Sequence, residues 1–516
     1  MAVVLVLMLI LAALAPSAFV AWRATGLNHL GAMHDDATYW ATAKALAGGR
    51  GYRMLWLPGE PRQTLYPPLY PLLLSTAWRI GGTFPNSAKL AVLLTWLMLP
   101  LLLFVTDRLA KVLGAGALAR CVLVVWLAWN PIVILLSTSL MSELLFTCAV
   151  VTVAWGIAQG CANDSADRIA WWAGCAGAIA YLTRGAGVVL LPAGVICFLV
   201  QRKYRCAGLF CAAMAPAIVA WELWIRIHAG DVGASGYRSY LGHFAGTTWS
   251  YRWMVLVNNL YLSSHRLADL MLPSSGLPGA EWIGIAIFVC TILALLHGVA
   301  RPRRPAFAAA WIALSYGVLV VVWPIPTASR YWVPALPLIL AYLVSLKPDF
   351  LTRHVILAAI ATLAGGYYSL ISYAAYSGVL PASLKRSENT LREMQPLYHW
   401  LGGHSPSAHL FTENAAMVYL RTGRTAVEPT IPVTDWYRSP AEIDAARADR
   451  LLEFARREGG LLLLSCASAA DLESDSFSPE TTHAVTWGWE AGTRANPRCA
   501  AFLLSNDICC WRYLSS

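Results

Sequence analysis

The chain has 516 residues, of which 58% are hydrophobic and only 13% are charged. Soluble globular domains contain about 25% charged residues, so a chain with half that share cannot cover a water-facing surface. This composition excludes a soluble multidomain enzyme, and it also excludes disordered and fibrous proteins. We therefore predict a polytopic α-helical membrane protein.

The distribution of charge divides the chain into two parts. Residues 1–382 contain 25 Lys and Arg against 12 Asp and Glu, a net charge of +13. Residues 383–516 contain 13 basic and 16 acidic residues, a net charge of −3. We interpret 1–382 as a transmembrane domain and 383–516 as a separate soluble domain. The positive charge of the first part indicates contact with anionic lipid or phosphate.

Apolar stretches suited to membrane helices recur along the first part of the chain, and a span needs about 20 such residues. We interpret eleven of them as helices, near 2–22, 89–106, 119–137, 141–158, 169–183, 185–200, 207–226, 282–299, 306–323, 331–346 and 353–375. The first stretch lacks the basic n-region of a signal peptide, so we expect an uncleaved helix.

Lys and Arg in short loops predict the orientation of the helices, because such loops stay in the cytoplasm. These residues concentrate near 108–120, 202–205, 301–304 and 347–353, on one side if the spans alternate. The N-terminus is then cytoplasmic and the C-terminal domain extracytoplasmic, which suits a bacterial inner (plasma) membrane with a periplasmic active site. An endoplasmic-reticulum membrane follows the same logic, with its lumen outside.

Two external loops follow from this orientation, at 23–88 and 229–281. The first is rich in Lys and Arg, against the charge rule, although loops longer than about 60 residues obey that rule weakly. An anionic ligand on the outer face would account for the excess. The second loop is a candidate lid or acceptor surface.

Adjacent carboxylates, Asp35 and Asp36, stand near the start of loop 23–88. The stretch Ala37–Ala47 is a good short helix that Gly48 and Gly49 end. Both carboxylates therefore lie at a helix N-terminus close to the membrane surface. One Asp at such a position can simply cap the helix. The pair is also a candidate general base that takes a proton from an acceptor hydroxyl.

Four more motifs follow in chain order. They are Tyr66-Pro67-Pro68-Leu69-Tyr70-Pro71, Ser142-Glu143, Thr183-Arg184 and Ser329-Arg330-Tyr331-Trp332. The prolines form a rigid elbow that can also be a plain lead-in to an interfacial helix. A lone Arg at a helix end usually extends to the interface. The predicted orientation nevertheless places these charges on one face, where the planar fork of Arg suits phosphate.

In this order the motifs resemble the GT-C superfamily of glycosyltransferases, and within it the branch of the protein O-mannosyltransferases and aminoarabinose transferases (glycosyltransferase family 39-like). The resemblance covers roughly residues 1–350 and rests on five motifs in order, since each motif alone is common. It implies a GT-C-like fold and an inverting enzyme that needs no metal or other cofactor. Its substrates would be a polyprenyl-phosphate-linked sugar and an acceptor glycan, lipid or protein.

The resemblance also implies roles for single residues. Asp35 would be the catalytic base, with Asp36 orienting it or tuning it. Some family members carry a Lys beside the Pro-Pro pair that contacts the donor phosphate, and here Tyr66 takes that position. The phosphate contact must then pass to arginines. The candidates are Arg184 and Arg330, with Arg62 and Arg53 as weaker ones, and the supporting residues are Tyr39, Tyr66, Glu143 and Tyr331.

Several further features admit more than one interpretation. His34 beside the aspartates leaves a metal possible, although a solvated loop histidine explains it more simply. Trp56, Trp249 and Trp253 in the external loops are candidates for stacking on a sugar. The cysteines of the C-terminal part are Cys466, Cys499, Cys509 and Cys510, and an oxidising compartment would permit a disulfide among them.

The C-terminal domain has the pattern of a small α/β fold. A capping box at Ser439-Pro440-Ala441-Glu442 begins a helix that runs to Glu458. Apolar strands are predicted at Leu461–Leu464 and at Ala500–Leu504. This alternation favours a mainly parallel sheet. We interpret the domain as a binding or positioning module, because it contains no catalytic motif.

Two functions from other classes remain as alternatives. A transporter or flippase of a lipid-linked sugar would show repeat symmetry and broken helices at the bilayer midplane, and the sequence shows neither. A catalytically inactive GT-C-like scaffold would not need the aspartate pair, although the missing Lys favours it. Beyond lipid bilayer, donor and acceptor, we expect no nucleic acid among the partners.

Overall fold

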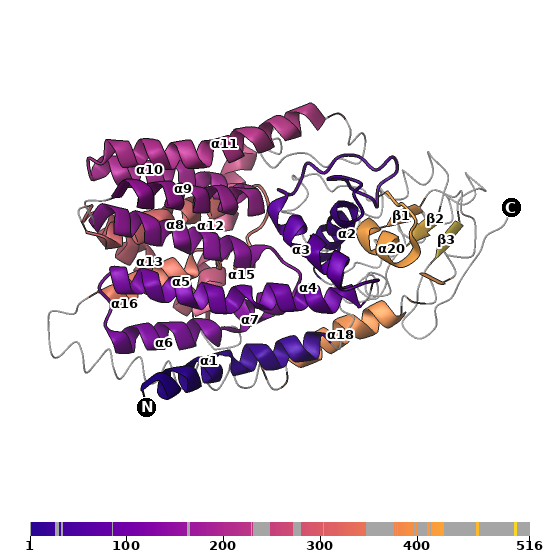
Figure 1. The fold of residues 1–516 in the computed structure, drawn as a ribbon, viewed down its shortest axis with the longest axis horizontal. Coiled ribbons are helices and arrows are strands. Elements are labelled where there is room, and N and C mark those ends of the chain that lie inside the picture. Colours follow the sequence, from indigo (N-terminus) through magenta and orange to yellow (C-terminus); the bar gives the residue numbers. More distant parts are fainter. Residues whose placement is uncertain are drawn as a thin grey trace.

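The computed structural model describes most of the chain up to residue 346 and shorter segments beyond it. The described residues are 2–346 apart from 26–29, 32, 34, 85, 163–165, 229, 231–247, 272–279 and 303, then parts of 376–399 and 410–427, and 461–463 and 500–502. Within them the chain is mainly helical, and the long helices lie side by side in a bundle (Figure 1).

The helices of the first half of the chain are α1 (Ala2–Thr25), α2 (Asp35–Ala47), α3 (Leu69–Ile80), α4 (Ser87–Trp96), α5 (Met98–Val112), α6 (Ala117–Ala128), α7 (Pro131–Thr138), α8 (Glu143–Ala162), α9 (Ala166–Thr183), η1 (Gly185–Val189), α10 (Leu190–Val200) and α11 (Tyr204–His228). Those that follow are α12 (Trp249–Met271), α13 (Ala280–Val299), α14 (Ala306–Val321), α15 (Ser329–Trp332), α16 (Leu336–Ser345), α18 (Leu380–Glu393) and α20 (Ala415–Thr422).

Helices occupy the predicted apolar stretches up to residue 346. Among the described residues, four helices are long and apolar enough to cross a membrane, namely α4 with α5 over Ser87–Val112, Glu143–Cys161 of α8, α11, and Glu281–Val299 of α13. The prediction of a polytopic helical membrane protein agrees with this finding. The count of eleven spans stays a prediction, and the stretch 353–375 lies outside the described residues.

One predicted helix, at 119–137, is broken in the middle. Its halves α6 and α7 meet at an angle of 56°. Asn130 caps α7 by accepting hydrogen bonds from the N–H groups of Ile132 and Val133, and Pro131 occupies the first turn. A proline there lacks the N–H that a continuous helix would need, so the chain starts a new helix instead.

Small residues bring the central helices of the bundle close together. A Cβ atom on Gly174 of α9 would lie 2.6 Å from the carbonyl oxygen of Phe210 in α11. A Cβ atom on Gly156 of α8 would lie 2.8 Å from the Cβ of Ala173 in α9. Close backbone approach through small residues is how helices pack in lipid, where no hydrophobic force drives them together.

The segment predicted as the loop 229–281 contains a long helix. α12 occupies Trp249–Met271 and packs against α13. Its large exposed apolar side chains include Trp249, Trp253 and Leu260, at spacings of four and seven residues that place them on one face. The remainder of the helix is polar enough to lower its average hydropathy, so an apolar stretch was not recognised.

α2 and α3 lie beyond one end of the bundle, together with α20 (Figure 1). The predicted helix Ala37–Ala47 is confirmed, and it starts two residues earlier at Asp35. Trp40 of α2 is fully buried and stacks on Trp78 of α3, with ring centroids 4.6 Å apart. The proline elbow leads into α3, so it fixes where this helix begins.

Three short parallel strands follow in the C-terminal part, in the order β1 (Leu410–Thr412), β2 (Leu461–Leu463) and β3 (Ala500–Phe502). The last two fall on the predicted strands. The predicted helix from Ser439 to Glu458 lies outside the described residues, as do the four C-terminal cysteines. The boundary between the two domains at residues 382 and 383 stays a prediction.

Candidate active site

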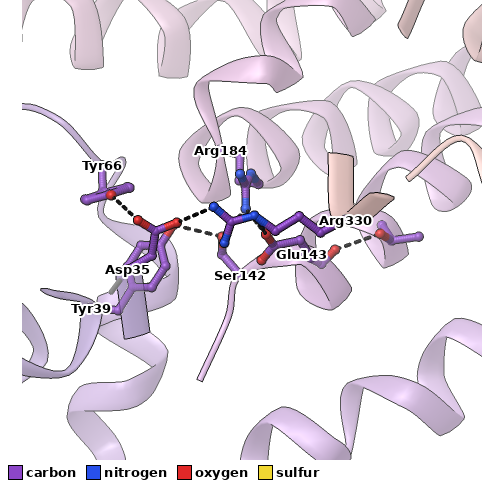
Figure 2. Close-up of polar contacts among 8 residues, drawn as sticks. Asp35, Tyr39, Tyr66, Ser142, Glu143, Arg184 and Arg330 are labelled. Carbon is purple, nitrogen blue, oxygen red and sulfur yellow. Dashed lines mark hydrogen bonds and ion pairs between the residues drawn. The ribbon is translucent and has the colours of Figure 1, made fainter. Parts of the chain in front are cut away.

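Asp35 lies at the first turn of α2 and directs both carboxylate oxygens toward other side chains. The hydroxyl of Tyr66 donates to Oδ1 over 2.7 Å, and Nη2 of Arg330 lies 3.2 Å from Oδ2. Figure 2 shows the Arg330 guanidinium reaching Asp35 from the opposite side to Tyr66. These contacts join the start of α2, the proline elbow and α15, three of the five motifs.

The carboxylate of Asp36 accepts hydrogen bonds from backbone N–H groups instead of facing the other charges. One carboxylate oxygen accepts from the N–H of Gly31 over 3.0 Å, and the other accepts from the N–H of Ala37 over 2.7 Å. The side chain is buried. Of the adjacent aspartates, Asp36 thus has the anchoring contacts expected at a helix start, and Asp35 faces the other charges.

Glu143 begins α8 and contacts both candidate arginines. Its Oε1 atom lies 2.9 Å from Nη1 of Arg184 and 3.9 Å from Nε of Arg330. Arg184 stands between α9 and η1, and Arg330 in the short helix α15. The four charged side chains Asp35, Glu143, Arg184 and Arg330 thus form one cluster, which we call the charged cluster (Figure 2).

Exposure differs within the charged cluster. The Glu143 side chain is 1% exposed, whereas those of Asp35, Arg184 and Arg330 are 18%, 21% and 25% exposed. A bound molecule can therefore reach Asp35 and the two arginines. Glu143 lies behind them as a buried negative charge that compensates the two guanidinium groups.

Ser142 links the charged cluster to the aromatic side chains of α2. Its Oγ lies 3.0 Å from the hydroxyl of Tyr39 and accepts from Nη1 of Arg184 over 3.1 Å. The Tyr39 ring also packs against Tyr66, with centroids 4.7 Å apart. Burial raises the pKa of Tyr39 well above its ordinary value, so its hydroxyl stays protonated. Ser142 was part of a recognised motif but was not assigned a role.

The weaker arginine candidates have other partners. Arg53 and Arg62 pair with each other through a β-bridge between α2 and α3. Nη1 of Arg53 donates to the carbonyl of Glu60 over 3.0 Å, and the Arg62 guanidinium lies 5.9 Å from the ring centroid of Trp224. Neither contact joins the charged cluster, and a phosphate-binding role for either arginine stays a prediction.

Other candidates differ in what the structure places around them. The guanidinium of Arg330 lies 5.3 Å from the ring centroid of Tyr331, which supports its position. Trp56 is fully buried and so has no free face for a sugar, whereas Trp249 is exposed. His34 lies outside the described residues. Within the part of the chain that the structure describes, no three His, Cys, Asp or Glu residues are grouped as metal ligands would be.

No protein-family model and no curated protein matches this chain. Its structure is similar to that of the aminoarabinose transferase ArnT from Cupriavidus metallidurans, with a TM-score of 0.55 and 16% identity over 92% of this chain and 95% of that one. ArnT bound to undecaprenyl phosphate gives a TM-score of 0.54 at 15% identity, over 94% and 95% of the two chains.

An oligosaccharyltransferase from Archaeoglobus fulgidus, tethered to an acceptor peptide, is similar over 92% of this chain and 72% of that one, with a TM-score of 0.50 and 11% identity. At such identities the likeness concerns the fold. The GT-C resemblance of the motifs is therefore confirmed at that level: the chain has the fold of the GT-C glycosyltransferases.

Proposed function

We propose that this protein is an integral-membrane glycosyltransferase. It transfers a sugar from a polyprenyl-phosphate-linked donor to an acceptor hydroxyl on the extracytoplasmic face of the membrane. The charged cluster is the observation that carries the proposal, because four segments far apart in sequence bring two carboxylates and two guanidinium groups together. The likeness to ArnT, which has been crystallised with undecaprenyl phosphate, supports a lipid-linked donor.

The proposed reaction needs a base and fixed positive charge. The acceptor oxygen attacks the anomeric carbon while the bond from that carbon to the phosphate oxygen breaks, which inverts the anomeric centre. The hydroxyl proton passes to the Asp35 carboxylate. The phosphate departs with an additional negative charge, which Arg184 and Arg330 stabilise through charge-assisted hydrogen bonds.

The exposures of the side chains support this division of roles. Asp35 and both arginines are accessible, whereas Glu143 is buried and cannot meet an acceptor hydroxyl. Glu143 instead holds the guanidinium groups in place. Tyr66 occupies the position of the Lys of some GT-C enzymes. Its hydroxyl donates to one carboxylate oxygen of Asp35, the proposed base, and so orients the other oxygen of that carboxylate.

A deletion strain complemented with variants tests the proposal. Mass spectrometry of its envelope lipids and glycans should show an accumulated polyprenyl-phosphate sugar and a glycan, lipid or protein that lacks one sugar residue. Wild type should reverse both changes and Asp35→Asn should reverse neither. The matched control is Asp107→Asn, because Asp107 pairs with Arg120 away from the charged cluster, and it should complement fully.

The same experiment separates the alternatives. Full complementation by Asp35→Asn would refute the proposed base and would favour a transporter or a scaffold. Accumulation of the lipid-linked sugar on the inner leaflet alone would identify a flippase. The sugar residue missing from the acceptor identifies the donor.

A further inference from the structure

Helix α20 of the C-terminal part lies against the external loop that contains the proposed base. The Nδ2 atom of Asn414 donates to the carbonyl of Gly31 over 3.2 Å. The ammonium of Lys44 in α2 lies 4.8 Å from the ring centroid of Tyr419. The two segments are nearly 400 residues apart in sequence, and Figure 1 shows α20 beside α2.

The peptide groups around Gly31 connect Asn414 to the start of α2. The Gly31 carbonyl accepts from Asn414, and the Gly31 N–H donates to Asp36 over 3.0 Å. Asp36 in turn accepts from the N–H of Ala37 over 2.7 Å. Hydrogen bonds on both sides of the Gly31 Cα atom therefore link Asn414, at the start of α20, to the first turn of the helix that carries Asp35.

Gly31 is held in a conformation that favours glycine, and it lies close to α20. Its φ angle is +101°, in the region that L side chains rarely adopt. A Cβ atom there would lie 3.1 Å from Sδ of Met417 in α20. The side of the loop that faces α20 is thus closely packed, and its position depends on where α20 lies.

Both ends of the Asn414 amide are used. Its Oδ1 accepts from the N–H of Met417 over 3.1 Å and so caps α20, while Nδ2 donates to Gly31. An aspartate at this position can still cap the helix but cannot donate to a carbonyl. The two functions of the side chain can therefore be separated by a single substitution.

We infer that Asn414 is a positioning residue, through which the C-terminal domain fixes the Asp35 carboxylate in the charged cluster. The inference rests on the proposed function of Asp35. General-base catalysis requires the base within hydrogen-bond reach of the acceptor proton, and small displacements of a positioned group are costly to rate. Asn414 does not touch the charged cluster in any of its described contacts, so it acts through the Gly31 loop.

The test compares three variants of the full-length protein in detergent or nanodiscs, with the lipid-linked sugar identified from the deletion strain as donor. Asn414→Asp should lower kcat about tenfold or more, since a displacement of about 1 Å can cost that much. KM for the donor should stay unchanged, because Arg184 and Arg330 are not altered. Gly31→Ala should have the same effect on kcat, because it disturbs the same contact between the loop and α20, from Gly31 instead of from Asn414.

The matched control is Asn130→Asp. Asn130 also caps a helix with its oxygen and donates its Nδ2 to a carbonyl, that of Leu270, over 2.8 Å. The substitution therefore makes the same chemical change elsewhere in the fold. Its kcat should remain near that of wild type even if its melting temperature falls as far as that of Asn414→Asp.

Two results would overturn the inference. One is a kcat for Asn414→Asp within about twofold of wild type. The other is an equal loss of kcat in Asn130→Asp, which would mean that the loss in Asn414→Asp comes from lower stability alone. Asp35→Asn in the same assay tests the proposed function separately, because its failure to lower kcat would refute the base whatever Asn414 does.

Discussion

Asp36 contacts backbone N–H groups, whereas the described contacts of Asp35 are with the Tyr66 hydroxyl and the Arg330 guanidinium. We therefore expect Asp36→Asn to affect mainly stability, because an amide nitrogen cannot accept from Gly31. A hydrogen bond to a charged group contributes about 1.5–3 kcal/mol. Thermal unfolding and transfer rate measured together should show a lower melting temperature and a loss of kcat no larger than that of Asn414→Asp, because both variants lose the same link through Gly31.

Asp35→Asn should show the opposite pattern. It removes the proposed base and leaves the backbone contacts of its neighbour in place. Loss of a general base lowers the rate by about 100-fold or more, while the melting temperature should stay close to that of wild type. Loss of kcat in Asp36→Asn without loss of stability would reverse the two assignments.

Glu143 compensates two guanidinium groups from a buried position. Glu143→Gln keeps the shape of the side chain but leaves both positive charges without this partner, which costs about 3–5 kcal/mol for a buried pair. We expect a lower melting temperature and a raised KM for the donor, measured by thermal unfolding and steady-state kinetics. Glu143→Asp, which retains the charge, should recover part of both, and a Gln variant as stable as wild type would contradict the assigned role.

Residue types predicted which side chains meet but not how each is oriented. Asp35, Glu143, Arg184 and Arg330 were all recognised, since charges at helix ends in a membrane protein are few. The division of labour between Asp35 and Asp36 depends on which one faces Gly31, and Gly31 is held by Asn414. That contact comes from a distant segment, so it could not be predicted from the residues around Asp35.

The segment between α14 and α15 leads to Arg330, and α12 holds it from the side. Nδ2 of the buried Asn259 donates to the carbonyls of Trp323 over 2.7 Å and Ile325 over 3.3 Å. Asn259→Ala removes these hydrogen bonds, and an unsatisfied buried group costs about 1–3 kcal/mol. We expect weaker donor binding and a lower melting temperature, because the segment before Arg330 loses its support.

The adjacent Asn258→Ala is the control for that prediction. Asn258 is exposed and donates only to the carbonyl of Met254 within its own helix, as far as its described contacts show. Donor titration and thermal unfolding of the two variants should separate them. Equal behaviour would mean that α12 does not support the Arg330 segment.

At the level of whole elements, helix boundaries marked by local residues could be predicted, whereas helices that depend on tertiary packing could not. Asn130-Pro131 and the Gly48-Gly49 pair are readable helix boundaries, and the structure has boundaries at both. The helix α20 has similar signals, with Asn414 before it and Gly423 at φ +74° after it, and so its boundaries too can be read from the sequence. Amphipathic α12 was missed because its apolar face is diluted by polar residues in any running average.

At the scale of the whole molecule, the orientation of the helices in the membrane is a prediction that labelling can test. Thr83, between α3 and α4, and Arg304, between α13 and α14, are both exposed and fall on opposite sides in the predicted topology. In a background with the other cysteines replaced, a membrane-impermeant maleimide should label Thr83→Cys in intact cells. Arg304→Cys should react only after permeabilisation, and the reverse result would invert the topology.

The pairing of Arg330 with Asp35 has a consequence for the kinetics. In the absence of a phosphate the Arg330 guanidinium pairs with the proposed base, so an acceptor that arrives first meets a carboxylate that is already paired. The donor phosphate would offer Arg330 a second anionic partner and so free Asp35 for proton transfer. If the proposed function holds, binding should then follow a compulsory order, with the donor before the acceptor.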